Sequence, residues 1–376
     1  MQPKAARNIS IEALRLVAVA GIAIFHTFQW AFQAACAGMP EYAPFVAFPY
    51  SGVLGFINLL GCWANEVFFM ISGYFLIASA ARAWNDGTTW ASQMQRTVQR
   101  LGKVVFPTAF YCLVALAWST TVSPIPDVSL ATHYWYTLGL EFIWVYAATV
   151  CLAPLFGLAM SRLSKRGYTA AAIVVGILTF VVNGYLAAMN STSSGEFSWL
   201  QKIMSAATYV VAFLIGGLLR DVTDSMGSGR ARALGSRSLI AVLAIAIVLE
   251  GTLSFTGNLA AMATLSYKST SLISFALAAA SLLFTATRNS TSSNPRVAGV
   301  IVTLSAATLG FYVMQSLTSS LWRPIFNAML ANILVAQSNP ASICIATGTA
   351  ISIVFALVLL VVDAVRSRVV HSLKQR

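Results

Sequence analysis

Ten stretches of about twenty mostly apolar residues follow one another along this chain, each of the length that a helix needs to cross a bilayer. In hydrocarbon, every backbone N–H and C=O must find its hydrogen bond within the protein, so such stretches fold as a bundle of helices. They lie at 11–33, 50–80, 101–122, 134–160, 168–189, 202–219, 238–256, 269–287, 298–322 and 342–363. We therefore predict an all-α integral membrane protein with about ten transmembrane helices.

The composition leads to the same class of protein. Hydrophobic residues make up 58% of the chain and charged residues 9%, whereas a soluble domain carries roughly a quarter charged residues. Two basic residues precede the first apolar stretch, as in a signal peptide, but the stretch is too long for a signal and has no clear small-residue cleavage site. We expect it to be retained as an anchor helix.

The positive charges are distributed so that they predict an orientation. If the N-terminus is cytoplasmic, nineteen of the 23 Lys and Arg residues lie in inner segments and Arg15 lies in the membrane. The three outer ones are Lys202, Lys268 and Arg323. By the positive-inside rule, both termini are cytoplasmic. This placement accounts for the net charge of +12 without a nucleic-acid partner, and we expect none.

The connections between the apolar stretches are short. The longest lie near 34–49, 82–100 and 323–341, and none is long enough for a second domain. We expect one domain over residues 1–376. The five cysteines are scattered, with no CxxC pair and no Cys/His cluster, so we predict neither a disulfide framework nor a metal site.

A stripe of ionisable residues runs down the first predicted helix. Arg15 and His26 are eleven residues apart, so they lie within roughly 20° of each other and about 16 Å apart along a straight helix. Glu12 falls on nearly the same line and is placed to orient Arg15. Charges at membrane depth often mark a site, where His26 would be a base and Arg15 would hold an anion. The alternative is a polar stripe that only packs helices.

The second predicted helix carries Glu66 in the middle of its span. An unpaired carboxylate there is expensive, so we expect His26 and Arg15 to be its partners, with Glu66 orienting the imidazole. The neighbouring Ser72 and Gly73 permit close helix approach.

Two further groups of residues are candidates for ligand binding. Arg96, Arg100 and Lys103 precede Pro107 at a cytoplasmic helix mouth, where they hold a phosphorylated cofactor or act as a topology signal that contacts anionic membrane lipids. At the outer end of the fourth predicted helix lie His133, Trp135 and Tyr136, with Glu141 about two turns inside the membrane. These aromatic residues fit an interfacial belt or a sugar-binding surface.

Taken together, five segments resemble the membrane acyltransferase 3 family, in particular the single-domain O-acetyltransferases of bacterial envelope glycans. The first is Arg15 followed by ten residues and His26. The others are the segments from Glu66 to Tyr74, from Arg100 to Pro107, from His133 to Tyr136 and from Leu309 to Gln315. Two departures stand out: Gln315 replaces a frequent histidine, and a single Arg with a Lys replaces a double Arg before Pro107.

The resemblance implies an enzyme of the bacterial inner membrane that moves acetyl from acetyl-CoA to a hydroxyl of an envelope polysaccharide or lipid-linked sugar. His26 would take the acceptor proton or be acylated first, with Glu66 and Arg15 beside it. The cofactor-binding residues would be Arg15, Arg96, Arg100 and Lys103. Substrate-binding residues would be His133, Trp135, Tyr136 and Glu141. Acyl-CoA is a co-substrate, so we expect no permanently bound cofactor and no metal. The alternative function is a proton-coupled transporter of a lipid-linked or small anionic substrate, with the same stripe as a proton relay.

Overall fold

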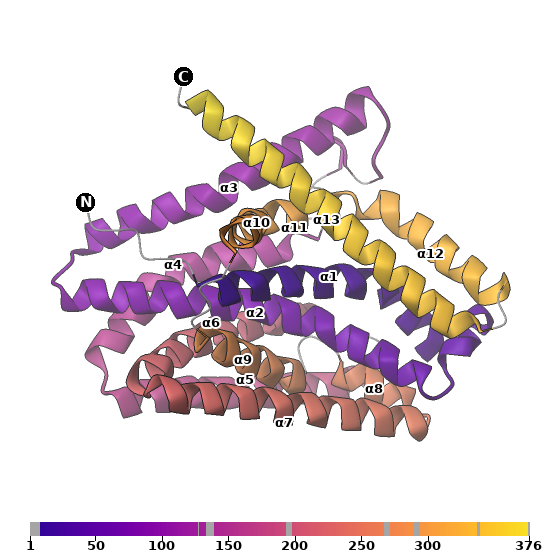
Figure 1. Cartoon of the computed structure of the whole chain (residues 1–376), viewed down its shortest axis with the longest axis horizontal. Coiled ribbons are helices and arrows are strands. Elements are labelled where there is room, and N and C mark those ends of the chain that lie inside the picture. The colour runs from indigo at the N-terminus through magenta and orange to yellow at the C-terminus, as the bar shows by residue number, and fades with distance from the viewer. Residues whose placement is uncertain are drawn as a thin grey trace.

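The computed structural model describes residues 8–126, 128–132, 139–192, 198–266, 271–288, 294–336 and 339–374. All regular elements within these ranges are helices (Figure 1). They are α1 (Ile9–Cys36), the 3-10 helix η1 (Pro40–Phe45), α2 (Tyr50–Asn85), α3 (Trp90–Thr121), α4 (Glu141–Arg162), α5 (Lys165–Thr192), α6 (Ser198–Ser225), α7 (Ser228–Phe255), α8 (Leu259–Leu265), α9 (Leu272–Ala286), α10 (Pro295–Ala306), α11 (Thr308–Leu317), α12 (Ser319–Ala336) and α13 (Pro340–Lys374).

The number of membrane spans is lower than predicted. Eight of the described helices are long and apolar enough to cross a membrane, and α10 with α11 adds a ninth if this pair, bent by 43°, is one span. The predicted span at 269–287 is α9, whose 15 residues are fewer than a bilayer crossing needs. The all-α, multi-pass class is confirmed, whereas the count of ten is not.

Local sequence signals account for where the helices that build the site begin. Asn8 precedes α1, and its side-chain oxygen accepts hydrogen bonds from the backbone N–H groups of Ser10 and Ile11 at 3.0 and 3.4 Å. Thr89 caps α3 in the same way, accepting from the N–H of Ser92 at 3.3 Å. Such caps satisfy backbone donors that the first helical turn leaves open.

The predicted outer loop near 323–341 is largely helical, because α12 runs to Ala336. Arg323 and Pro324 interrupt the apolar pattern of this stretch, which is why it reads as a loop. Pro324 removes one backbone hydrogen bond, and the apolar residues after it carry the helix on. Arg323 therefore lies on a helix, not on a connecting loop.

The helix α2 forms the centre of the bundle. Within its most apolar window 72% of the residues are buried, against 17% in α7, because α1, α4, α6 and α9 all pack against it. A Cβ atom at Gly73 of α2 would overlap the carbonyl oxygen of Phe213 in α6, and one at Gly216 would overlap that of Met70. Glycine at both positions thus lets the two backbones touch.

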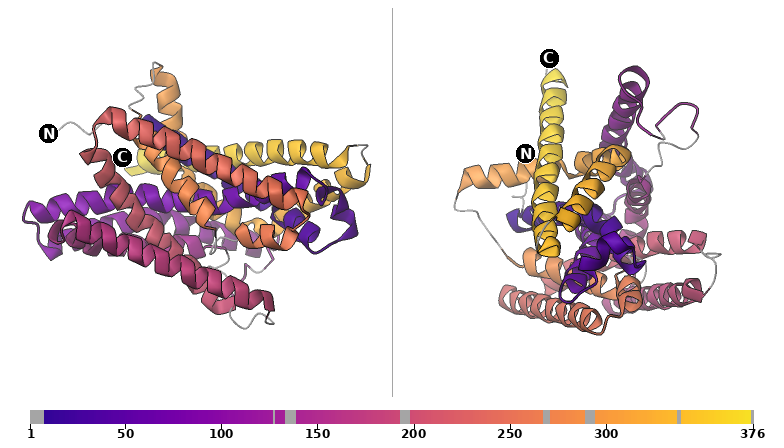
Figure 2. Two further views of the ribbon diagram at one scale, coloured as in Figure 1. Left: turned by 90° about the horizontal axis from the view of Figure 1, so that it is seen from below. Right: turned by 90° about the vertical axis from the view of Figure 1, so that its right-hand side faces the viewer.

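The helices α3 and α13 stand out from the rest of the bundle on one side (Figure 2), and α11 packs between them. Where the three meet, Asp363 is 2% exposed. It pairs with Arg366 Nε at 2.7 Å and accepts a hydrogen bond from Tyr111 Oη at 2.7 Å. A side chain at Gly310 would overlap the Asp363 carboxyl. The Gly310 segment that contributed to the family resemblance therefore has a structural role here.

Orientation in the membrane stays a prediction, and cysteine labelling tests it. In a protein whose native cysteines are replaced, we expect a membrane-impermeant maleimide added to intact cells to label Thr256→Cys, at the end of α7, but not Ser225→Cys, at the end of α6. Both positions are exposed, so only the side of the membrane distinguishes them. If only Ser225→Cys were labelled, the protein would have the opposite orientation to the predicted one.

Candidate functional site

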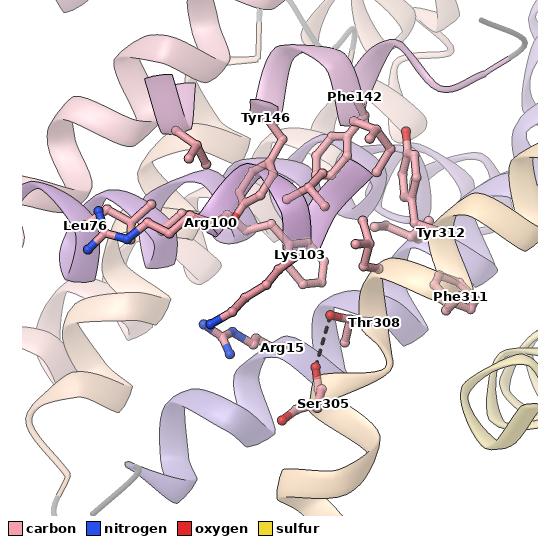
Figure 3. Close-up of a pocket in the computed structure, with 18 residues that line it drawn as sticks. Arg15, Leu76, Arg100, Lys103, Phe142, Tyr146, Ser305, Thr308, Phe311 and Tyr312 are labelled. Atoms are coloured by element: carbon pink, nitrogen blue, oxygen red, sulfur yellow. Dashed lines mark hydrogen bonds between the residues drawn. The ribbon is translucent and has the colours of Figure 1, made fainter. Parts of the chain in front are cut away.

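A cavity of about 330 Å³ opens between α1, α2, α3, α4 and the α10–α11 pair. Figure 3 shows the side chains that surround it. The lining residues are Arg15, Ile22, Phe68, Ser72, Leu76, Arg100, Lys103, Val104, Phe142, Ile143, Tyr146, Val150, Ser305, Ala306, Thr308, Leu309, Phe311 and Tyr312. Three predicted cofactor-binding residues from two distant segments thus line one cavity.

The charged part of this cavity is cationic. The side chains of Lys103 and Arg15 point toward each other across the cavity, and Arg100 extends from the same helix as Lys103 (Figure 3). Arg100 Nη1 is buried and has no hydrogen-bond partner among the residues that the structure describes. Among the described residues, none that lines the cavity is acidic. Three cations held together without a carboxylate in the lining attract an anionic ligand.

Glu12 holds Arg15 in place from outside the cavity. Its Oε2 lies 2.9 Å from Arg15 Nη1 and accepts a hydrogen bond from Ser305 Oγ at 2.6 Å. Because Ser305 belongs to α10, this contact also connects α1 to α10, which lines the same cavity. Glu12 therefore orients Arg15, a geometry that the spacing of three residues allows.

Aromatic rings form the opposite wall of the cavity. The rings of Phe142 and Tyr312 lie 4.5 Å apart between centroids. Tyr146 Oη lies 3.2 Å from Ser72 Oγ, which joins α4 to α2. The cavity thus combines a cationic region with an apolar, aromatic passage.

His26 lies one helical turn beyond Ile22, the cavity residue that is nearest to it along α1. It is not itself a lining residue. Its Nδ1 atom is 3.2 Å from Arg323 Nη2 and 3.4 Å from Gln29 Oε1. The Arg323 contact brings together residues almost three hundred positions apart.

Sequence reasoning missed Arg323 because it counted the residue as an outer-loop charge. One signal could have found it. Like Arg15, Arg323 is a lone cation within an otherwise apolar stretch, and a charge in that setting needs a wet or polar neighbour.

Comparison with known proteins decides the family. A family model described as an acyltransferase domain matches residues 8–359. The chain belongs to this membrane acyltransferase family. No curated protein and no solved structure matches it. The match spans α1 to α13, so it includes all the helices that line the cavity.

In this acyltransferase the expected partnership of Glu66 with His26 and Arg15 is wrong. Glu66 is fully buried, and within the described part of the chain neither carboxyl oxygen has a hydrogen-bond partner. Space for a Cβ at Gly61 is taken by Phe25, and at Gly21 by Trp63 and Ala64, so α1 and α2 run antiparallel. In that register Glu66 lies about 10 Å along the bundle from His26.

The other cofactor and substrate predictions have mixed outcomes. Arg96 does not line the main cavity but a separate hollow with Arg82 and Asp86 at the turn between α2 and α3. Glu141 is exposed at the first position of α4 and not two turns into that helix as predicted. A carboxylate at a helix N-terminus is favoured by the helix dipole. His133, Trp135 and Tyr136 lie outside the described residues, so their proposed contact with the acceptor stays a prediction.

Proposed function

We propose that this acyltransferase transfers acetyl from cytoplasmic acetyl-CoA to a hydroxyl of an envelope polysaccharide or lipid-linked sugar, in the inner membrane of a bacterium. The observation that carries the proposal is the cavity itself. It gathers Arg15, Arg100 and Lys103, and it extends along α1 to Ile22, one turn from His26. One elongated ligand with an anionic head and a reactive tail matches that arrangement.

Each part of acetyl-CoA has a counterpart in the cavity. The phosphates would bind the three cations, since guanidinium groups form paired hydrogen bonds with phosphate. The pantetheine arm would follow the aromatic wall between Phe142 and Tyr312. The thioester would then lie at the end nearest to His26.

The reaction needs one base and releases one thiol. His26 would take the proton of the acceptor hydroxyl as its oxygen attacks the thioester carbonyl. The carbon–sulfur bond then breaks, the acetyl group stays on the acceptor oxygen as an ester, and the CoA sulfur takes the proton back from the imidazolium. Glu66 has no place in this step because it does not contact His26.

A transfer assay tests the proposal. Membrane vesicles containing the protein would receive radiolabelled acetyl-CoA and total envelope glycan, and the glycan would be analysed for base-labile label. We expect label in the glycan together with an equal release of CoA thiol. Absence of both would show that acetyl-CoA is not the donor.

We expect Arg100→Ala and Lys103→Ala each to raise the KM for acetyl-CoA by about 10- to 100-fold. A hydrogen bond to a charged group contributes about 1.5–3 kcal/mol, and every 1.4 kcal/mol is about a tenfold change in affinity. The measurement is the initial rate of transfer against acetyl-CoA concentration.

Acetyl-pantetheine, which lacks the nucleotide phosphates, is the control donor, and both variants should use it as well as the unmodified protein does. Arg296→Ala, an exposed cation on α10 outside the cavity, is the matched control variant. An unchanged KM for acetyl-CoA in both cavity variants would show that the phosphates do not bind at this site.

A further inference from the structure

A second hollow, of about 370 Å³, lies at the turn that joins α2 to α3. The two helices diverge from this turn (Figure 1). The lining residues are Ser79, Arg82, Ala83, Asp86, Gly87, Thr88 and Arg96. In the ranges that the structure describes, no ion pair includes Arg82 or Arg96. Because neither guanidinium is held by a carboxylate, both can bind an anion that enters the hollow.

The hollow continues the cationic end of the main cavity along both helices. On α2, Leu76 lines the cavity and Ser79, three residues later, lines the hollow. On α3, Arg100 lines the cavity and Arg96, four residues earlier, lines the hollow. Residues three or four apart lie on one face of a helix. The same faces of α2 and α3 therefore line both spaces.

The hollow lies beyond the end of the main cavity that is opposite to His26. On α1 the cavity extends toward His26 as far as Ile22. The antiparallel helix α2 leads the other way, from Leu76 in the cavity to its last residue, Asn85, beside the hollow. A donor with its thioester near His26 and its diphosphate at Arg100 therefore has its nucleotide directed toward the hollow.

We propose that this hollow binds the 3′-phosphate of the CoA nucleotide, with Arg82 and Arg96 as its ligands. This subsite rests on the proposed function and extends it to a second set of residues. Besides its diphosphate, CoA carries a phosphate monoester on its ribose, and such a group has a charge of about −1.5 to −2 at pH 7. Arg96 lies about 6 Å from Arg100 along α3, which suits two phosphate groups attached to the same ribose.

The other polar groups of the hollow suit a phosphorylated nucleoside. Ser79 and Thr88 line it, and their hydroxyl groups can donate to phosphate oxygens. Asp86, the residue that follows α2, can accept a hydrogen bond from a ribose hydroxyl or from the amino group of adenine. An inorganic anion has neither of these donors. The combination of two arginines with one carboxylate therefore favours a nucleotide.

Acetyl-dephospho-CoA, which lacks only the 3′-phosphate, tests this subsite. In the unmodified protein we expect its KM to be about tenfold higher than that of acetyl-CoA, a modest factor because both arginines are exposed and solvent weakens their contacts. In the double variant Arg82→Ala with Arg96→Ala, the two donors should have the same KM. Equal KM values in the unmodified protein would overturn the proposal.

Three control variants make the comparison specific. Arg96→Lys keeps a cation and should retain most of the preference for acetyl-CoA. Arg100→Ala removes a ligand of the diphosphate, which both donors carry, so it should raise both KM values by the same factor. Arg296→Ala, an exposed cation outside both spaces, should change neither. If Arg296→Ala lost the preference as fully as the double variant does, the effect would be one of overall charge and the proposal would be wrong.

Equilibrium binding separates this subsite from the proposed function because it needs no turnover. The whole protein in phosphatidylcholine nanodiscs would be titrated with adenosine 3′,5′-bisphosphate and with 5′-AMP. We expect the unmodified protein to bind the bisphosphate about tenfold more tightly, and the double variant to bind both ligands alike. If acetyl-CoA gave no transfer while this preference remained, the proposed function would be wrong and the nucleotide subsite would stand.

Anionic membrane lipids also carry phosphate, so a lipid headgroup is the competing ligand. A photoreactive phosphatidylglycerol in the same nanodiscs distinguishes the two sources, and we expect the unmodified protein and the double variant to capture it equally. The opposite result has two parts: both proteins bind the bisphosphate alike, and only the unmodified protein captures the lipid. That result would make the hollow a lipid site and overturn the proposal.

Discussion

Replacing His26 by alanine is expected to lower the rate of acetyl transfer by about 10²–10⁴, the usual contribution of a general base. The alcohol of the acceptor is a poor nucleophile until its proton leaves. Glu66 lies too far along the bundle to take the place of His26. We would measure kcat and KM in vesicles with labelled acetyl-CoA and envelope glycan.

The kinetic constants should distinguish a role of His26 as general base from a role in binding acetyl-CoA. We expect kcat to fall and the KM for acetyl-CoA to change little, because the cations that would hold the phosphates line the cavity and His26 does not. Gln33→Ala, an exposed neighbour on α1, is the matched control and should keep normal constants. Turnover of His26→Ala within a few-fold of the unmodified protein would exclude His26 as the base.

Replacing Gly73 or Gly216 by alanine is expected to destabilise the protein by about 3 kcal/mol or more each, the upper part of the range for overpacked interiors. In both cases the added methyl group would overlap a backbone carbonyl of the facing helix. A side chain can change rotamer to make room, but a helix backbone can only move as a whole. Separation of α2 from α6 would then loosen the centre of the bundle.

A glycine with free space around it provides a control, because its replacement by alanine should change the stability in the opposite direction. Gly251 in α7 has no atom within 4 Å of a built Cβ, and glycine in a helix interior is about 1 kcal/mol less favourable than alanine. Gly251→Ala should therefore be neutral or stabilising. Thermal melting of the purified protein in detergent would compare the variants, and a Gly73→Ala protein that melts with or above the unmodified one would contradict the packing.

The helical class and the positions of the cations could be predicted because both depend on local properties. A stretch of about twenty apolar residues is satisfied in hydrocarbon only as a helix, whatever its neighbours are. The spacing of Arg15 and His26 follows from helical periodicity alone. Arg100 and Lys103 are three residues apart, so helical periodicity also predicts that they share a face, although α3 begins at Trp90 and not at the predicted residue 101.

Other features required the packed structure. Whether α9 has enough residues to cross a membrane, and whether α10 and α11 form one straight helix, depend on the helices around them. Arg323 and Pro324 interrupt the apolar pattern of α12, so the sequence does not predict a helix there. In the packed structure, the contacts of its apolar residues stabilise the helix despite these two residues.

By itself, the sequence determined that this protein is a helical membrane bundle with a histidine and an arginine along one face of its first helix. Only the tertiary structure decided what meets that histidine. The antiparallel register of α1 and α2 places Glu66 away from it, and α12 brings Arg323 to it across almost three hundred residues. Periodicity determines which residues share a face within one helix, but the rotation and sliding of helices against each other depend on side chains from the whole bundle.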